Sequence, residues 1–255
     1  MERIDDHDRA SRWLSALEGR YLADLRLPEV TRALRALSAT YVERRQRGPG
    51  AHVRGALDTA GKRAAFAMYY GPLHFIAVTE VVRALGASQP APAAIIDLGC
   101  GTGVAGAAWA IAAGSTPVVT GIDRHPWAVA EARWTYRQLG VQGHVRQGDA
   151  WRLPFSRAGA SVIAAYVLNE LADAERRTLE DQLIEVAHRG GRILIVEPIA
   201  RAVSPWWTST ATRVTAAGGR ADEWRLQIDA PPIVRQLGTA AGLNYRELRL
   251  QTLFL

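Results

Sequence analysis

The stretch Ile95-Ile96-Asp97-Leu98-Gly99-Cys100-Gly101-Thr102-Gly103 combines an apolar run, a carboxylate and three glycines at alternate positions. Because small residues follow it over 104–113, it predicts a buried strand, a tight turn and the start of a helix. Glycines in such a turn let the backbone approach a ligand closely. The amides at the start of the helix favour a polar or anionic group. Glycines used only for packing would give the same pattern, so other residues must decide between the two interpretations.

Other apolar runs downstream also end in carboxylates. Residues 118–122 lead into Asp123, and residues 144–148 lead into Asp149. A further apolar run follows over 160–166. Acidic residues at the carboxyl ends of neighbouring parallel strands can bind a nucleoside, because one carboxylate accepts both ribose hydroxyls. The spacing therefore predicts a nucleoside site along one edge of a parallel sheet.

The motif 97–103, with Asp123 and Asp149 at these intervals, resembles the class I S-adenosylmethionine-dependent methyltransferases. A nicotinamide site would instead show G-x-G-x-x-G. The resemblance covers about residues 90–200 and implies S-adenosylmethionine as the cofactor. It implies that the motif holds the methionine end, Asp123 the ribose and Asp149 the adenine amino group. The cofactor-binding residues expected from it are Asp97, Gly99, Cys100, Gly101, Gly103, Asp123, Arg124, Asp149, Ala150 and Trp151.

Strands and helices alternate through the later part of the chain. Helices are expected over 126–140 and 173–188, and a fifth strand over 192–197. This alternation predicts an α/β fold with a doubly wound, mostly parallel, Rossmann-like methyltransferase sheet. We then expect a short strand at 224–228 and a last strand at 245–254. The chain ends where the second arm of the usual closing hairpin would come.

The segment 1–90 is expected to form an N-terminal helical cap, and 91–255 the Rossmann-like S-adenosylmethionine-binding domain. Apolar residues at helical spacing predict two helices before Gly48-Pro49-Gly50. Pro72 is expected to break a third helix and to begin a fourth, which runs to about Leu85. These helices should pack against the sheet.

Aromatic residues gather around that proline, immediately before the cofactor domain, and are candidates for an acceptor pocket. The substrate-binding residues expected are Tyr69, Tyr70, His74, Asn169 and Trp206. Ordinary core packing is the alternative role for the tyrosines, and a structural histidine is as plausible an interpretation of His74 as a catalytic one.

The reaction demands little of the protein, because a sulfonium methyl is already an activated electrophile. The site must align a nucleophile with the departing sulfur and desolvate both. An oxygen or nitrogen acceptor also needs a base for its proton. The catalytic candidates are Glu170, His74 and Tyr166, with Glu197 at the end of the fifth strand. Capping a helix or pairing with an arginine is the alternative role for Glu170.

Composition bounds the compartment and the partners. Cys100 is the only cysteine and the histidines are scattered, so no metal site is expected. The charge of +6 invites a nucleic-acid partner, but Lys62 is the only lysine, and a GC-rich genome would produce this arginine bias by itself. Since no apolar run approaches the roughly 18 residues of a membrane span and the first residues are charged, we expect a cytoplasmic protein without a membrane partner.

A second resemblance lies in residues 165–171 and in Glu197-Pro198. With the upstream helical segment, they resemble the methyltransferase-like family of the mitochondrial small ribosomal subunit and its bacterial relatives. That family carries cysteines for an iron–sulfur cluster, and residues 200–232 contain none. The preferred function is therefore methyl transfer to an oxygen or nitrogen of a small molecule held under the helical cap. The alternatives are an rRNA methyltransferase and an assembly factor of the small ribosomal subunit.

Overall fold

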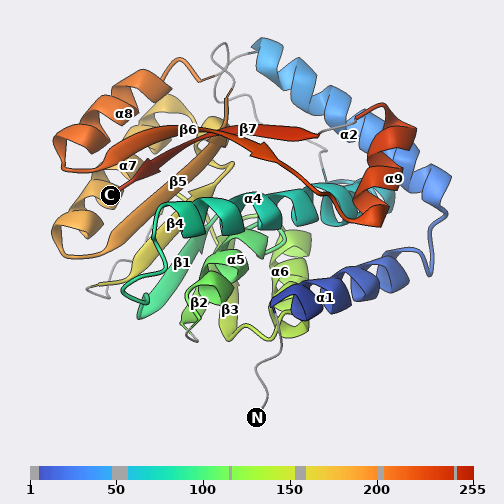
Figure 1. Cartoon of the computed structure of the whole chain (residues 1–255). Coiled ribbons are helices and arrows are strands. Elements are labelled where there is room, and N and C mark those ends of the chain that lie inside the picture. Colours follow the sequence, from blue (N-terminus) through green and yellow to red (C-terminus); the bar gives the residue numbers. More distant parts are fainter. Residues whose placement is uncertain (1–5, 48–56, 115–116, 153–158, 200–203, 244–245) are drawn as a thin grey trace.

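The computed structural model describes residues 6–47, 57–114, 117–152, 159–199, 204–243 and 246–255. Within them, a single mixed sheet lies between two layers of helices (Figure 1). Its strands are β1 (Ala94–Leu98), β2 (Val118–Asp123), β3 (Gly143–Gln147), β4 (Ser161–Ala165), β5 (Arg192–Pro198), β6 (Arg220–Gln227) and β7 (Glu247–Phe254).

The strand order is β3-β2-β1-β4-β5-β7-β6. The first five strands in this order pair in parallel, and β7 runs antiparallel to both β5 and β6. The expected class, a mostly parallel Rossmann-like α/β fold, is confirmed. Because parallel strands end at the same edge, the glycine loop (residues 99–103) after β1 lies at the carboxyl edge between the ends of β2 and β4.

Helices cover both faces of this sheet. The α-helices of the described chain are α1 (Asp6–Tyr21), α2 (Leu27–Arg47), α3 (Ala60–Ala65), α4 (Gly71–Ala84), α5 (Val104–Ala112), α6 (Pro126–Gln138), α7 (Asp173–His188), α8 (Trp207–Ala216) and α9 (Pro232–Ala241). Two shorter turns matter for the site: η1, a π-helical turn at Phe66–Tyr70, and η2, a 3₁₀ turn at Leu168–Glu170.

Alternating side chains of the strands supply two separate cores. Ile163 and Leu194 belong to the larger core, which α4, α5 and α6 cover. Val162 and Ile193, their neighbours in sequence, belong to the core under α7 and α8. This is the period of two that a strand buried on both faces requires. Figure 1 shows α4, α5 and α6 on one side of the sheet and α7 and α8 on the other.

The N-terminal helices share the larger core. The same buried cluster contains Ile95 of β1 together with Trp13 of α1, Leu34 of α2 and Ala64 of α3. Helix α1 packs on α6, and α2 packs on α9 near the other end of the chain (Figure 1). The division of the chain at residue 90 stays a prediction, and Gly48-Pro49-Gly50 lies outside the described residues.

The prediction that Pro72 breaks a helix is wrong, because the helix continues from Ala60 to Ala84. In η1 the N–H of Gly71 donates to the carbonyl oxygen of Phe66, so the turn holds one extra residue. Pro72 then lies in the first turn of α4, where the ring is tolerated. Of the helices described, this one alone has the length and apolar composition to cross a membrane, and it is mostly buried inside the fold.

The expected C-terminal hairpin is also placed differently. The short strand predicted at 224–228 is the longer β6, which is one arm, and β7 is the other arm, inserted between β5 and β6. The charged, mostly exposed β6 suits an edge, whereas Leu250 and Leu253 of β7 are buried and need neighbours on both sides. No strand after residue 254 is required to complete the hairpin.

The contact between α1 and α6 can be tested through Arg20. Its guanidinium lies 3.2 Å from the carboxylate of Glu131, which is 1% exposed, and 4.6 Å above the ring of Trp134. We expect Arg20→Ala to lower the free energy of unfolding by about 1–2 kcal/mol, because a buried carboxylate loses its cation. Arg20 itself is 38% exposed, which keeps the loss below that of a fully buried pair.

Urea denaturation measures this effect. The double variant Arg20→Ala/Glu131→Gln should recover part of the stability, since no unpaired charge remains. If the double variant is no more stable than Arg20→Ala, the loss comes from packing and not from the charge.

Candidate functional site

The three glycines of the glycine loop serve different needs, although all have positive φ, at 58°, 52° and 79°. A Cβ on Gly99 would lie 2.6 Å from Val167, and a Cβ on Gly103 would lie 2.8 Å from Tyr136. These two positions are therefore required by packing. A Cβ on Gly101 would lie 3.6 Å from the ring of Phe66, which is an ordinary contact distance. Crowding therefore does not require a glycine at position 101.

Two carboxylates hold the loop in shape from inside. Asp123 Oδ2 accepts the N–H of Gly101 at 2.9 Å, and its Oδ1 accepts the N–H of His125 at 2.8 Å. Asp97 Oδ2 accepts the N–H of Gly106 at 2.8 Å. The N–H groups of Gly101 and Gly106, which the sequence suggested could bind a ligand, thus donate to carboxylates of the fold itself. These hydrogen bonds hold the loop from within the fold.

Asp97 and Cys100 are buried, and burial governs their protonation. Burial raises the pKa of Asp97 to about 7; the N–H of Gly106 opposes this rise, and the charge of Asp123 adds to it. Burial, together with the charges of Asp97 and Asp123, raises the pKa of the Cys100 thiol well above its usual range. Cys100 is therefore a neutral packing group beneath the loop, and its N–H donates to the carbonyl oxygen of Ile122. Of these groups, Asp123 alone is partly exposed at the strand edge.

The residues expected around ribose and adenine lie after neighbouring strands. Asp149, 47% exposed, follows β3 and lies 3.8 Å from the guanidinium of Arg152. Ala150 and Trp151 come next, and Arg152 lies 4.5 Å above the ring of Trp151. Together with Asp123, they give the carboxyl edge two partly exposed carboxylates and one indole.

An ion pair joins the ends of β2 and β4 across β1, which lies between them. Arg124 Nη2 lies 3.8 Å from Glu170 Oε2, and the two side chains are 52% and 38% exposed. The alternative interpretation of Glu170, as the partner of an arginine, is thus realised in the structure. An exposed pair at this separation contributes little to stability, so a ligand can displace it at small cost.

Four rings from two elements gather beside the glycine loop, and we call Phe66, Tyr70, His74 and Tyr166 the aromatic wall. The first three are spaced by four residues along one helical face. The rings of His74 and Tyr166 stack at 3.8 Å with an angle of 17° between their planes. Phe66 lies at contact distance from a Cβ placed on Gly101. The sequence pointed to Tyr70, His74 and Tyr166 but missed Phe66, which the four-residue spacing would have revealed.

The wall presents neutral groups. Burial lowers the pKa of His74 to about 3, and burial together with the charge of Glu197 raises the pKa of Tyr166 above its ordinary value. Tyr166 also has φ of 61°, the only positive φ outside glycine in the described residues. Such strain on a bulky residue is concentrated at functional sites.

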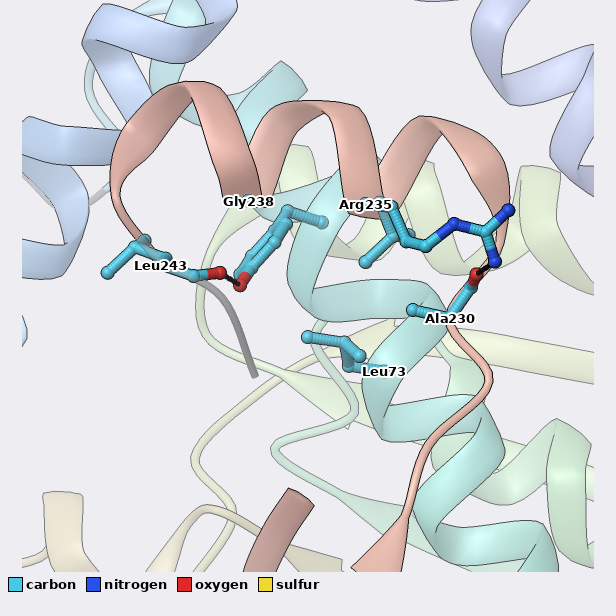
Figure 2. Close-up of a pocket in the computed structure, with 7 residues that line it drawn as sticks. Leu73, Ala230, Arg235, Gly238 and Leu243 are labelled. Atoms are coloured by element: carbon cyan, nitrogen blue, oxygen red, sulfur yellow. Dashed lines mark hydrogen bonds between the residues drawn. The ribbon is translucent and has the colours of Figure 1, made fainter. Parts of the chain in front are cut away.

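Trp206 does not line this wall, and Tyr69 adjoins it through an edge-on contact with Tyr70, with 5.2 Å between the ring centroids. Tyr69 lies about 100° around the helix from Tyr70 and donates from its hydroxyl to the carbonyl oxygen of Leu243, at 2.8 Å. It borders a cavity of about 20 Å³ beside α9, drawn in Figure 2, which suits one water and not an acceptor. Trp206 belongs to the core on the other face of the sheet. The expected five-residue pocket is therefore not one continuous lining.

A hydrogen-bonded network occupies Asn169 and Glu197. Glu197, fully buried at the end of β5, accepts the N–H of Leu168 at 2.8 Å and the amide of Asn169 at 2.5 Å. Asn169 Oδ1 in turn accepts from Ser204 at 2.9 Å and from Trp206 at 3.1 Å. Burial raises the pKa of Glu197 to about 8. Glu197 is thus enclosed by the fold, whereas Glu170 reaches the surface of the site.

Comparison with known proteins agrees with this architecture. Residues 95–191 match the family model described as a methyltransferase domain. The match makes this part of the chain similar to methyltransferase domains, and the strand order is that of the Rossmann-like methyltransferase fold, whose cosubstrate is S-adenosylmethionine. The site fits that cosubstrate, because Asp123 and Asp149 are partly exposed at adjacent strand ends beside the glycine loop.

Three similar proteins illustrate the match. The 2-ketoarginine methyltransferase of Streptomyces arginensis is 33% identical over 132 residues, which are 49% of this chain and 37% of that protein. The chain thus spans little more than a third of that curated relative. A structure described as an O-methyltransferase from Nostoc punctiforme has a TM-score of 0.53 at 14% identity, over 93% of this chain and 72% of its own. The magnesium protoporphyrin IX methyltransferase of Synechocystis has a TM-score of 0.48 at 19% identity, over 72% of this chain and 80% of its own.

The role expected for Asp123 can be measured directly. We expect Asp123→Ala to weaken S-adenosylmethionine binding by about 1–3 kcal/mol, because the ribose hydroxyls lose their acceptor and the glycine loop and the start of α6 each lose one hydrogen bond. Isothermal titration calorimetry gives the affinity. Asp123→Asn, which keeps one acceptor oxygen, should fall between alanine and wild type. Wild-type affinity in the alanine variant would refute the ribose assignment.

Proposed function

We propose that the protein transfers a methyl group from S-adenosylmethionine to an oxygen or nitrogen of a small-molecule acceptor. The main support is the aromatic wall, where the stacked rings of His74 and Tyr166 join the helix before the sheet to the end of β4. An acceptor beside the glycine loop would therefore lie against a helix and a strand end that share one core. The curated relative is named for 2-ketoarginine, which is also a small molecule.

In this proposal each residue has a defined task. Asp123 holds the ribose hydroxyls and Asp149 the adenine amino group. The bound cosubstrate supplies a methyl group already activated by its sulfonium charge. Phe66, Tyr70 and Tyr166 exclude water and orient the acceptor, which raises the fraction of productive encounters.

Glu170 is the proposed acceptor of the proton that the nucleophile loses. It reaches the surface of the site and its partner Arg124 is half-exposed, so the ion pair can open. His74 is unsuited to this task, because a group with a pKa of about 3 is a weak base. We assign His74 to the acceptor pocket, as a neutral ring that can accept a hydrogen bond.

Some of the arginines have a structural role, which accounts for part of the basic composition without an RNA partner. Arg9 donates to the carbonyl oxygen of Leu139, and Arg133 donates twice to that of Val145. Arg192 donates to the carbonyl oxygen of Ala87 in the same way. These three arginines therefore join separate elements of the fold.

Transfer of label identifies the acceptor. The protein is incubated with S-adenosylmethionine labelled in its methyl group, together with the separated RNA and metabolite fractions of a cell extract. We expect the metabolite fraction to gain label, and Glu170→Gln to lower this transfer while leaving cosubstrate affinity unchanged. Label in RNA, with binding that weakens steeply as salt is added, would favour the ribosomal methyltransferase. Cosubstrate binding without transfer to either fraction would favour an assembly factor.

The role of His74 separates packing from proton transfer. His74→Phe keeps a flat ring against Tyr166, so we expect kcat/KM within about threefold of wild type, whereas His74→Ala should lose about tenfold or more through poorer orientation. Steady-state kinetics on the labelled acceptor measure both. If the two variants lose activity equally, and by roughly a hundredfold or more, His74 acts as the base.

A further inference from the structure

The turn that follows β4 carries a tyrosine in a backbone conformation that favours glycine. Tyr166 has φ of 61°, and its N–H donates to the carbonyl oxygen of Val196 at 2.8 Å. Its ring lies on His74. A bulky residue keeps such a conformation only when the surrounding structure imposes it, so the chain on both sides of Tyr166 must be held.

The chain before Tyr166 is held by the pairing of β4 with β5, and the chain after it is held by Glu197. Glu197 Oε1 accepts the N–H of Leu168 at 2.8 Å and that of Asn169 at 3.4 Å. These are the first two residues of η2, directly after Tyr166 and Val167. A single carboxylate from the neighbouring strand thus fixes where the turn begins.

The second oxygen of Glu197 extends this hold to α8. Oε2 accepts the side-chain amide of Asn169, whose own oxygen accepts from Ser204 and Trp206. In each of these contacts one group donates and the other accepts: the NH₂ group of Asn169 donates to Glu197, and its oxygen accepts from Ser204 and Trp206. Glutamine at position 197 would set its NH₂ group against the NH₂ group of Asn169. Turning Asn169 over would relieve that clash but would set its NH₂ group against the indole N–H of Trp206, which can only donate.

We propose that Glu197 is the positioning residue of the site, whose buried carboxylate holds the 168–170 turn and thereby keeps Tyr166 stacked on His74. The contact is a property of the folded chain, and only its kinetic consequence rests on the proposed methyl transfer. Glu197 has no part in proton transfer here, because the fold encloses both of its oxygens.

The NMR signal of His74 reports the stack. A ring stacked on Tyr166 experiences its ring current, which shifts the imidazole protons upfield. The chain has six histidines, so His74→Ala assigns the signal and Tyr166→Leu gives its unstacked position. We expect Glu197→Gln, compared with wild type above pH 8 where Glu197 is ionised, to move the His74 signal most of the way to the unstacked position, and to speed hydrogen exchange of the Leu168 amide roughly tenfold.

A matched control comes from Glu180. This carboxylate of α7 is also buried and accepts from Thr210 at 2.5 Å and Arg213 at 2.7 Å, away from the aromatic wall. Glu180→Gln should leave the His74 signal at its wild-type position. Its neighbours Arg176 and Thr210 also contact Trp206, so this control tests whether a disturbance at Trp206 is enough to move the stack. A shift of equal size in Glu180→Gln would show that the stack does not depend on Glu197 in particular, and would overturn the proposal.

Exchanging the two polar groups provides the rescue. In Glu197→Gln/Asn169→Asp the amide and the carboxylate change places, so the donor and acceptor between them again match. The carboxylate now at position 169 can still accept from Ser204 and Trp206. The double variant should return the His74 signal towards wild type, and it carries the test if Glu197→Gln alone does not fold. A folded Glu197→Gln with an unmoved signal, or a folded double variant with an unstacked one, would overturn the proposal.

Kinetics separate this proposal from the proposed function. If the protein transfers methyl groups, Glu197→Gln should lower kcat more than it changes cosubstrate affinity, because the wall is displaced while Asp123 is untouched. If no acceptor is found, the His74 signal and the Leu168 exchange still decide the role of Glu197.

Discussion

The carboxylate of Asp123 is the constraint on which the site depends. By accepting the N–H groups of Gly101 and His125, it ties the end of β2 to the glycine loop on one side and to the start of α6 on the other. Asp97 likewise ties the end of β1 to α5 by accepting the N–H of Gly106. The loop therefore takes its shape from the fold and not from a ligand, and a ligand that binds there need not order it. Such preorganisation is the usual way in which a site gains affinity without additional contacts.

The aromatic wall extends this rigidity to the acceptor side. Phe66 and His74 belong to the helix whose buried face lies in the same core as the central strand, and Tyr166 is fixed by the β4–β5 ladder and by Glu197. Both halves of the wall are therefore anchored in the sheet. The π-turn η1 matters here, because its extra residue sets the phase of the helix before and after Pro72.

Local sequence predicted the parts of this site that local chemistry decides. The acids near the ends of β1, β2 and β3 could be predicted, because each acid lies in its strand or shortly after it in sequence. The continuous helix through Pro72 could not, since the π-turn depends on packing against residues outside that helix. The insertion of β7 between β5 and β6 is likewise a long-range pairing. No sequence pattern signals the positive φ of Tyr166, which depends on contacts made by residues about 30 positions away.

Burial makes the wall suited to a cationic methyl donor. Desolvation keeps His74 neutral, so the wall places no imidazolium beside a sulfonium, where two like charges would repel. The faces of Phe66, Tyr70 and Tyr166 carry the negative side of the aromatic quadrupole, which attracts a cation. Methyl transfer to a nucleophile that has lost its proton joins a cation to an anion and leaves neutral products. In the proposed reaction, low-polarity surroundings would favour that change, and the burial that lowers the pKa of His74 would then also favour the transfer.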